Sequence, residues 1–154
     1  MSNARSLRID HEEDMRVLAV RIAQLLKIGD VLTLQGDLGA GKTVFARALV
    51  NALAPAPEEV PSPTFTLVQV YDHQTPAIWH FDLYRLEDQT EILELGWDEA
   101  RRGGVAVVEW PERLGSLLPK DRLEIGIEFI ADSENARQVT FTPYGKWIGR
   151  QKDE

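Results

Sequence analysis

The chain has 154 residues, of which 44% are hydrophobic and 27% charged, with a formal charge of −8 and no cysteine. This length fits one domain with a genuine core. The lack of cysteine excludes disulfides and thiolate metal sites and agrees with a cytoplasmic location. No apolar run approaches the roughly 18 residues that a membrane span needs, and residues 1–14 lack the apolar stretch of a secretory signal. The acidic charge and the absence of a basic cluster exclude independent, tight nucleic-acid binding, so such contact is expected only within a larger assembly.

The first third of the chain predicts two strands that each precede a helix. Residues 6–9 read as a short strand, and apolar residues recur on one helical face across 12–27. Asp10 lies just upstream, in a position to cap that helix. Residues 31–35 then predict a buried strand and 42–53 a second helix.

The middle of the chain begins with a connector, 54–63, which contains four prolines. Strands are predicted at 64–71 and 77–84, with a hairpin-length turn between them. Residues 87–96 predict a short helix that ends at Gly96.

The last third predicts strands only. Residues 105–110 form an apolar strand that runs into a carboxylate, and 122–130 and 137–142 predict a closing strand pair. The tail from about 145 to 154 is expected to lack fixed structure. The alternation predicts an α/β fold: a single P-loop NTPase-like domain, residues 1–154, with a mixed parallel/antiparallel sheet flanked by helices.

The strongest chemical signal is the segment GDLGAGKT between the strand 31–35 and the helix 42–53. It satisfies G-x-x-x-x-G-K-[ST], a loop whose backbone N–H groups surround the phosphates of a nucleoside triphosphate. The lysine is expected to contact the β- and γ-phosphates and the threonine hydroxyl to bind Mg²⁺. A glycine-rich turn that binds nothing is the alternative, but a lysine at a helix N-terminus is electrostatically unfavourable without an anion. The predicted nucleotide-binding residues are Gly36, Asp37, Leu38, Gly39, Ala40, Gly41, Lys42 and Thr43, with Asp37 turned outward.

A P-loop also needs an acid at a strand end to hold Mg²⁺ or its water. Glu109 ends the apolar run VAVV, and Asp82 lies in HFDLYR, where alternation sets His80, Asp82 and Tyr84 on one face. The alternative for Glu109 is an exposed strand-end carboxylate. For Asp82 it is a salt bridge to Arg85 or a helix cap. Since parallel strands present their carboxyl ends at one edge, both acids are expected beside the glycine loop.

Two further features remain open between function and plain structure. SPTF at 62–65 is either a switch that senses the γ-phosphate or a turn leading into a strand, and the turn is favoured. Arg85 is either an internal arginine finger or the partner of a nearby carboxylate. The four tryptophans are expected to pack rather than to stack on a base.

Four segments, GDLGAGKT, VPSPTFTLVQVY, HFDLYR and VVEWPERL, resemble in order and spacing the bacterial TsaE (YjeE) family. The similarity runs from about residue 7 to about residue 142. It implies a small ATPase of tRNA threonylcarbamoyladenosine biosynthesis that binds ATP and Mg²⁺. Its implied partners are TsaD and TsaB, which carry out the transfer to tRNA while the ATPase activates or resets them, so that hydrolysis is slow alone and depends on these partners.

The resemblance also assigns roles to individual residues. Thr43 and Glu109 match the family's Mg²⁺ positions, and Asp82 matches the acid needed for hydrolysis, so Asp82, Glu109 and Lys42 form the predicted catalytic set. Ser62 to Thr66 match the switch-like segment, and Arg137 lies near a late arginine of the nucleotide pocket. Many members open the first helix with Glu-Thr, whereas this chain has Asp14-Met15, which leaves the contacts to the base open.

Three other classes of function compete with this interpretation. A P-loop small-molecule kinase is the main alternative, but it usually carries an arginine-bearing lid, and no arginine-rich insertion is evident. A guanine-nucleotide switch commonly uses an N-K-x-D segment, which this sequence lacks. A binding module without catalysis would not need the two strand-end acids.

Overall fold

The computed structural model describes residues 4–37, 40–53, 67–72, 76–131 and 133–151. The connector at 54–63 and the segment from Ser62 to Thr66 lie outside the described residues, as do Leu38 and Gly39 of the glycine loop. The strands are β1 (Arg5–Ile9), β2 (Val31–Gln35), β3 (Val68–Tyr71), β4 (Ala77–Asp82), β5 (Gly104–Glu109), β6 (Arg122–Ile130) and β7 (Ser133–Tyr144). The helices are α1 (Glu12–Leu25), α2 (Lys42–Leu53), α3 (Glu91–Glu94), α4 (Trp97–Gly103), the 3-10 helix η1 (Pro111–Leu117) and α5 (Trp147–Gln151).

The described strands form one sheet in the order β1-β7-β6-β2-β5-β4-β3. β2 runs parallel to both β5 and β6, and β4 runs parallel to β5. Antiparallel pairs close both sides of this parallel centre: β3 with β4, β6 with β7, and β1 with β7. The predicted mixed sheet is therefore confirmed.

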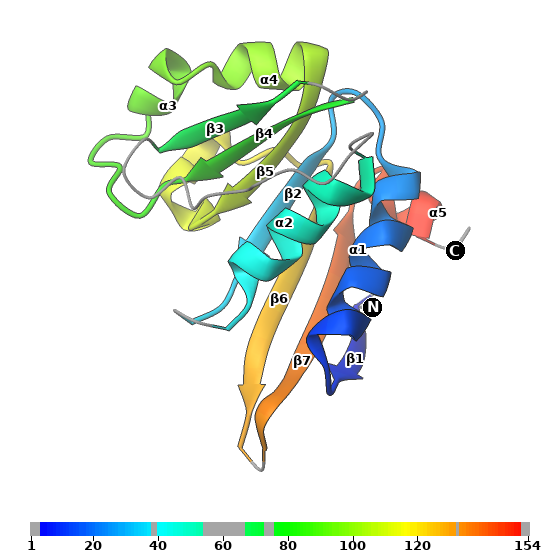
Figure 1. Cartoon of the computed structure of the whole chain (residues 1–154). Helices are drawn as coiled ribbons and strands as arrows, with labels where there is room; N and C mark the ends of the chain where they lie inside the picture. Colours follow the sequence, from blue (N-terminus) through cyan, green and yellow to red (C-terminus); the bar gives the residue numbers. More distant parts are fainter. Residues whose placement is uncertain (1–3, 38–39, 54–66, 73–75, 132, 152–154) are drawn as a thin grey trace.

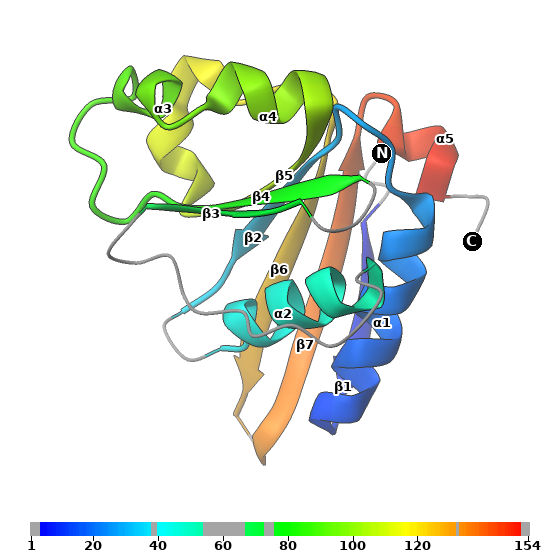
Figure 2. The same cartoon turned by 45° about the horizontal axis from the view of Figure 1, so that its top comes forward.

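Two helical layers cover the two faces of the sheet (Figures 1 and 2). On one face α1 and α2 bury the apolar stripes that their sequence periodicity predicts, including Ile22 and Leu49, against β-strand residues such as Leu34. On the other face α3, α4 and η1 cover Phe81 and the buried residues near it on β2, β4 and β5. Successive side chains of a strand point to opposite faces of the sheet, so the same strands contribute residues to the hydrophobic cores on both faces.

The parallel centre gives the sheet two unlike edges. At the carboxyl edge, β2, β4 and β5 end at Gln35, Asp82 and Glu109, and the last two are register partners. At the amino edge the same strands begin, next to the turn before β2 and next to α5. Ligands of open α/β sheets bind at the carboxyl edge.

Several predicted boundaries change in the structure. The helix predicted for 87–96 is shorter in the structure and consists of α3 alone. Gly96, in the left-handed region (φ 97°), is the N-cap of α4, a helix that was not predicted. A Cβ at Gly96 would collide with the ring of Trp79, so the turn requires glycine. Asp10 does not cap α1: the N-cap residue is His11, and Asp10 pairs with Arg8 instead.

The tail also differs from its prediction. Residues 147–151 form α5 rather than an unstructured end, because Trp147, 1% exposed, packs into the core on the α1 side. β7 begins at Ser133 rather than at 137. Among the helices of the described residues, none has the length and hydropathy to cross a bilayer.

Candidate functional site

The described part of the glycine loop leaves β2 and enters α2 through two glycines with positive φ, Gly36 at 151° and Gly41 at 118°. A Cβ at Gly36 would collide with the carbonyl oxygen of Ile127 on β6, so only glycine fits there. Between the two glycines the Ala40 N–H donates to the Asp37 carbonyl (3.0 Å), and the Asp37 side chain is exposed. The first N–H groups of a helix have no partner within it, so α2 directs N–H donors and the positive end of its dipole toward the carboxyl edge.

Lys42 is buried (7% exposed), although lysine is rarely buried without an anionic partner. Its ammonium lies 4.7 Å from the centre of the Trp110 ring, within the range of a cation–π contact. Trp110 directly follows β5 in the left-handed conformation (φ 61°, ψ 52°), which is strained for a bulky residue. Tyr84 also packs against Trp110, with 5.0 Å between the ring centres. Trp110 thus packs, as predicted, but against the loop lysine.

The two predicted acids lie side by side on neighbouring parallel strands, as the sequence predicted. Asp82 and Glu109 are 6% and 4% exposed and occupy the same register position on β4 and β5. Glu109 is therefore not an exposed strand-end group. Asp82 accepts the backbone N–H of Tyr84 (3.1 Å), which fixes the turn after β4.

Glu109 has a buried partner that the sequence analysis did not assign. The Nε2 atom of His80 lies 2.7 Å from Glu109 Oε2, and the His80 side chain is fully buried. The alternation in HFDLYR placed His80 on the face of Asp82, which was the one available signal for its role. The contact itself spans 29 residues of sequence and depends on the pairing of β4 with β5.

A cavity of about 270 Å³ opens beside the glycine loop. Its lining comes from the end of β1, the start of α1, the loop, the start of α2 and the start of β7. It includes Ile9, His11, Met15, Gly41, Val44 and Arg137. Arg137, which the resemblance assigns to the nucleotide pocket, lines this cavity together with His11, to which the sequence analysis gave no site role. Met15 also lines this cavity, which places part of the Asp14-Met15 pair beside the loop.

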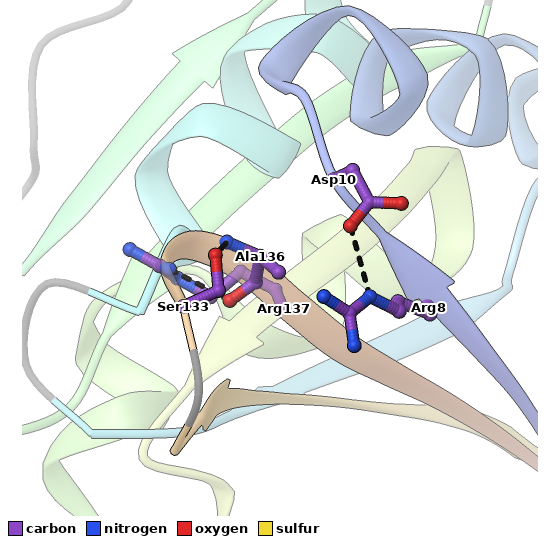
Figure 3. A network of polar contacts seen from close by, with 5 residues as sticks. All are labelled: Arg8, Asp10, Ser133, Ala136 and Arg137. Atoms are coloured by element: carbon purple, nitrogen blue, oxygen red, sulfur yellow. Dashed lines mark hydrogen bonds and ion pairs between the residues drawn. The ribbon is translucent and has the colours of Figure 1, made fainter.

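Arg137 joins the cavity wall to the glycine loop. Its Nε donates to the Ala40 carbonyl (3.0 Å), Nη1 donates to the Ala136 carbonyl (2.9 Å), and the guanidinium lies 4.4 Å from the centre of the Phe129 ring. Figure 3 shows this strand start next to the end of β1, where Arg8 pairs with Asp10 (2.9 Å). The hydrogen bond from Arg137 to Ala40 thus connects the start of β7 to the glycine loop.

The site offers oxygen ligands and charge of the kinds that a hard divalent cation and a polyphosphate require. Thr43 lies half-buried in the first turn of α2, and the carboxylates of Asp82 and Glu109 lie at the neighbouring strand ends. The described residues contain no group of three or more histidines, cysteines or acids able to enclose a metal by themselves. This set suits Mg²⁺, which keeps several waters and substrate phosphates as ligands and uses one or two protein oxygens.

Fold and site together define a class: an α/β protein in which a glycine loop joins a central parallel strand to a helix beside two buried acids. The family model described as threonylcarbamoyl adenosine biosynthesis protein TsaE matches residues 9–139. The chain therefore belongs to the TsaE family.

Individual relatives agree with this assignment. The Bacillus subtilis protein named tRNA threonylcarbamoyladenosine biosynthesis protein TsaE is 42% identical over 139 residues, covering 90% of this chain and 85% of the relative. The protein of the same name from Aquifex aeolicus is 45% identical over 106 residues, covering 68% and 75%. The crystal structure of Bacillus subtilis YdiB superposes with a TM-score of 0.82 at 33% identity, covering 99% of this chain and 94% of that one. The predicted family and fold are confirmed.

Proposed function

We propose that this protein is the ATP-binding and ATP-hydrolysing component of the tRNA threonylcarbamoyladenosine machinery, acting in the cytoplasm with TsaD and TsaB. Its membership in the TsaE family supports the pathway. The observation that carries the nucleotide assignment is the buried Lys42 at the N-terminus of α2, beside two buried acids at the carboxyl edge. A buried cation next to the N–H donors of a helix N-terminus fits a polyanion.

The proposed roles follow from the chemistry of each side chain. Lys42 binds the β- and γ-phosphates, and backbone donors of the glycine loop surround them. Thr43 and Glu109 hold Mg²⁺, which would neutralise phosphate charge as the terminal bond breaks. Asp82 orients the attacking water and accepts its proton.

The cavity next to the loop fits the nucleoside part of ATP. It has apolar walls in Ile9 and Met15 and polar groups in His11 and Arg137, the mixture that small-molecule sites commonly show. Calorimetric titration with ATP and with GTP, each with Mg²⁺, tests this assignment. We expect heat with ATP and a weaker response with GTP. No heat with either nucleotide would overturn the proposed function.

The coupling to tRNA modification needs a second measurement. The rate of phosphate release should be low for the protein alone and should change when TsaD, TsaB and tRNA are added together. The net charge of −8 predicts no tight binding of tRNA in the absence of those proteins. Unchanged hydrolysis with all components present, together with no complex in gel filtration with ATP, would contradict the assignment. Phosphate transfer to a metabolite instead of water would support the kinase alternative.

A further inference from the structure

The pair formed by His80 and Glu109 lies at the inner side of the carboxyl edge. Glu109 is the last residue of β5, whereas His80 lies on β4 two residues before that strand ends. The His80 side chain is 0% exposed and the Glu109 side chain 6% exposed. This hydrogen bond of 2.7 Å is therefore shielded from water, where such contacts are stronger.

The chemistry of the two groups fixes the direction of the bond. A carboxylate that is ionised to hold a cation only accepts, so Nε2 of His80 then carries the proton and its N–H donates a hydrogen bond to Oε2 of Glu109. Nδ1 of the same ring is buried and has no hydrogen-bond partner among the described residues. Nε2 of His80 thus hydrogen-bonds Glu109, and Nδ1 has no hydrogen-bond partner in the described part of the chain.

This arrangement is a poor choice for stability alone. An apolar side chain would fill the position without burying an unsatisfied polar atom, which is costly. What the imidazole adds is a fixed orientation of the carboxylate. With Oε2 engaged by His80, Oε1 of Glu109 is left for another partner.

We propose that His80 is a positioning residue that orients Glu109 for a divalent cation at the carboxyl edge. The inference rests on the proposed function, which assigns Glu109 to Mg²⁺. Residues that hydrogen-bond a metal ligand commonly change metal affinity by about 10- to 100-fold when they are replaced. His80 itself does not touch nucleotide or metal in this scheme.

The test compares His80→Leu, which removes the donor, with His80→Gln, whose amide nitrogen can replace Nε2. For each protein, the dissociation constant of ATP is measured by calorimetry in Mg²⁺ and in EDTA. The readout is the ratio of the constant in EDTA to the constant in Mg²⁺, which is large when Mg²⁺ strengthens binding. We expect His80→Leu to lower this ratio about 10- to 100-fold, and His80→Gln to stay within about threefold of the wild type. Hydrolysis by His80→Leu should also need more Mg²⁺ for half-maximal rate.

A matched control separates positioning from loss of core packing. Ile78 is fully buried on the same strand and the same face, and Ile78→Val removes volume without touching Glu109. This variant should melt at a lower temperature yet keep the wild-type ratio. A wild-type ratio in His80→Leu, or an equal loss in His80→Gln and His80→Leu, would overturn the proposal. A wild-type protein whose ATP affinity ignores Mg²⁺ would instead contradict the proposed function, before any variant is measured.

Discussion

Each edge of the parallel sheet has a cation over a tryptophan ring and a buried aspartate, but the residues that these groups contact differ between the two edges. At the carboxyl edge the ammonium of Lys42 lies over the ring of Trp110 at 4.7 Å. At the amino edge the guanidinium of Arg150 lies over the ring of Trp147 at 4.4 Å. Arg150 in addition forms an ion pair with Asp30 and donates a hydrogen bond to the carbonyl of Leu25.

The buried aspartates repeat the contrast. Asp30, 8% exposed, accepts from both Arg150 and the backbone N–H of Lys27. Asp82, 6% exposed, accepts the backbone N–H of Tyr84 and lies next to a second acid, Glu109. The amino edge therefore neutralises its own buried charges, which stabilises the fold. At the carboxyl edge a buried lysine starts α2 and two buried acids end β4 and β5, and buried ionisable groups gathered in this way are functional candidates.

The largest expected effect is on hydrolysis and comes from Asp82→Asn. The amide keeps the shape and can still accept the Tyr84 N–H, but it cannot take a proton from water. We expect turnover in the presence of the partner proteins to fall by about 10²-fold or more, with ATP affinity little changed. Asp30→Asn is the matched control at the amino edge and should leave turnover per folded molecule unchanged. Normal hydrolysis by the Asp82 variant would remove this residue from the catalytic set.

Arg150→Ala should have the largest effect on stability. It leaves Asp30 buried without its ion pair and uncovers the Trp147 ring, so we expect the free energy of unfolding to fall by about 3 kcal/mol. Urea unfolding followed by circular dichroism measures this loss, and calorimetry at a temperature where the variant is folded should show wild-type ATP affinity. A variant as stable as the wild type would mean that the amino edge is not the self-sufficient charge cluster described here.

Local sequence signals predicted the elements that define the carboxyl edge. β2 and α2 have the predicted bounds, because a buried apolar run, glycines and helical periodicity all act within a few residues. The ends of β4 and β5 were placed together by a general property of parallel strands. Asp82 and Glu109 accordingly meet at one edge, as the sequence predicted, while the site roles of Asp82, Glu109, Lys42 and Arg137 stay predictions.

The amino edge was not predictable in the same way. α5 is a single short helix whose stability comes from burying Trp147, and no local pattern indicates that its partner is the core beside α1. The same limit applies to α4, which begins after Gly96 within a stretch of mixed polarity. His80 and Glu109 meet through strand pairing across 29 residues, a contact that depends on tertiary structure.

Lys42→Ala should reduce ATP affinity and leave the fold intact, the reverse of Arg150→Ala. Loss of a charged donor to phosphate is expected to weaken binding by about 10- to 100-fold, equivalent to roughly 1.5–3 kcal/mol. The free energy of unfolding without nucleotide should not fall, since a buried ammonium is itself unfavourable. Calorimetric titration and urea unfolding of the same sample check both statements. A marked loss of stability would show that Lys42, like Arg150, serves the structure.

The smallest expected effect belongs to Asp88, a carboxylate in the loop between β4 and α3 that is satisfied locally and fully exposed. The backbone N–H of Thr90, and after it the Thr90 hydroxyl, hold the pKa of Asp88 below its ordinary value. A carboxyl whose pKa is lowered by folding stabilises the native state above its unfolded pKa, and this contribution is lost as the pH falls through the lower folded pKa. Asp88→Asn should therefore be slightly less stable than the wild type near neutral pH, and the difference should vanish in acid, once the pH has fallen below the lowered pKa of folded Asp88. Urea unfolding at both pH values measures it, and a difference that persists in acid would mean that the shape of the side chain, rather than its charge, holds the turn. Solvent screens this exposed group, so its effect stays below those of the buried aspartates at either edge.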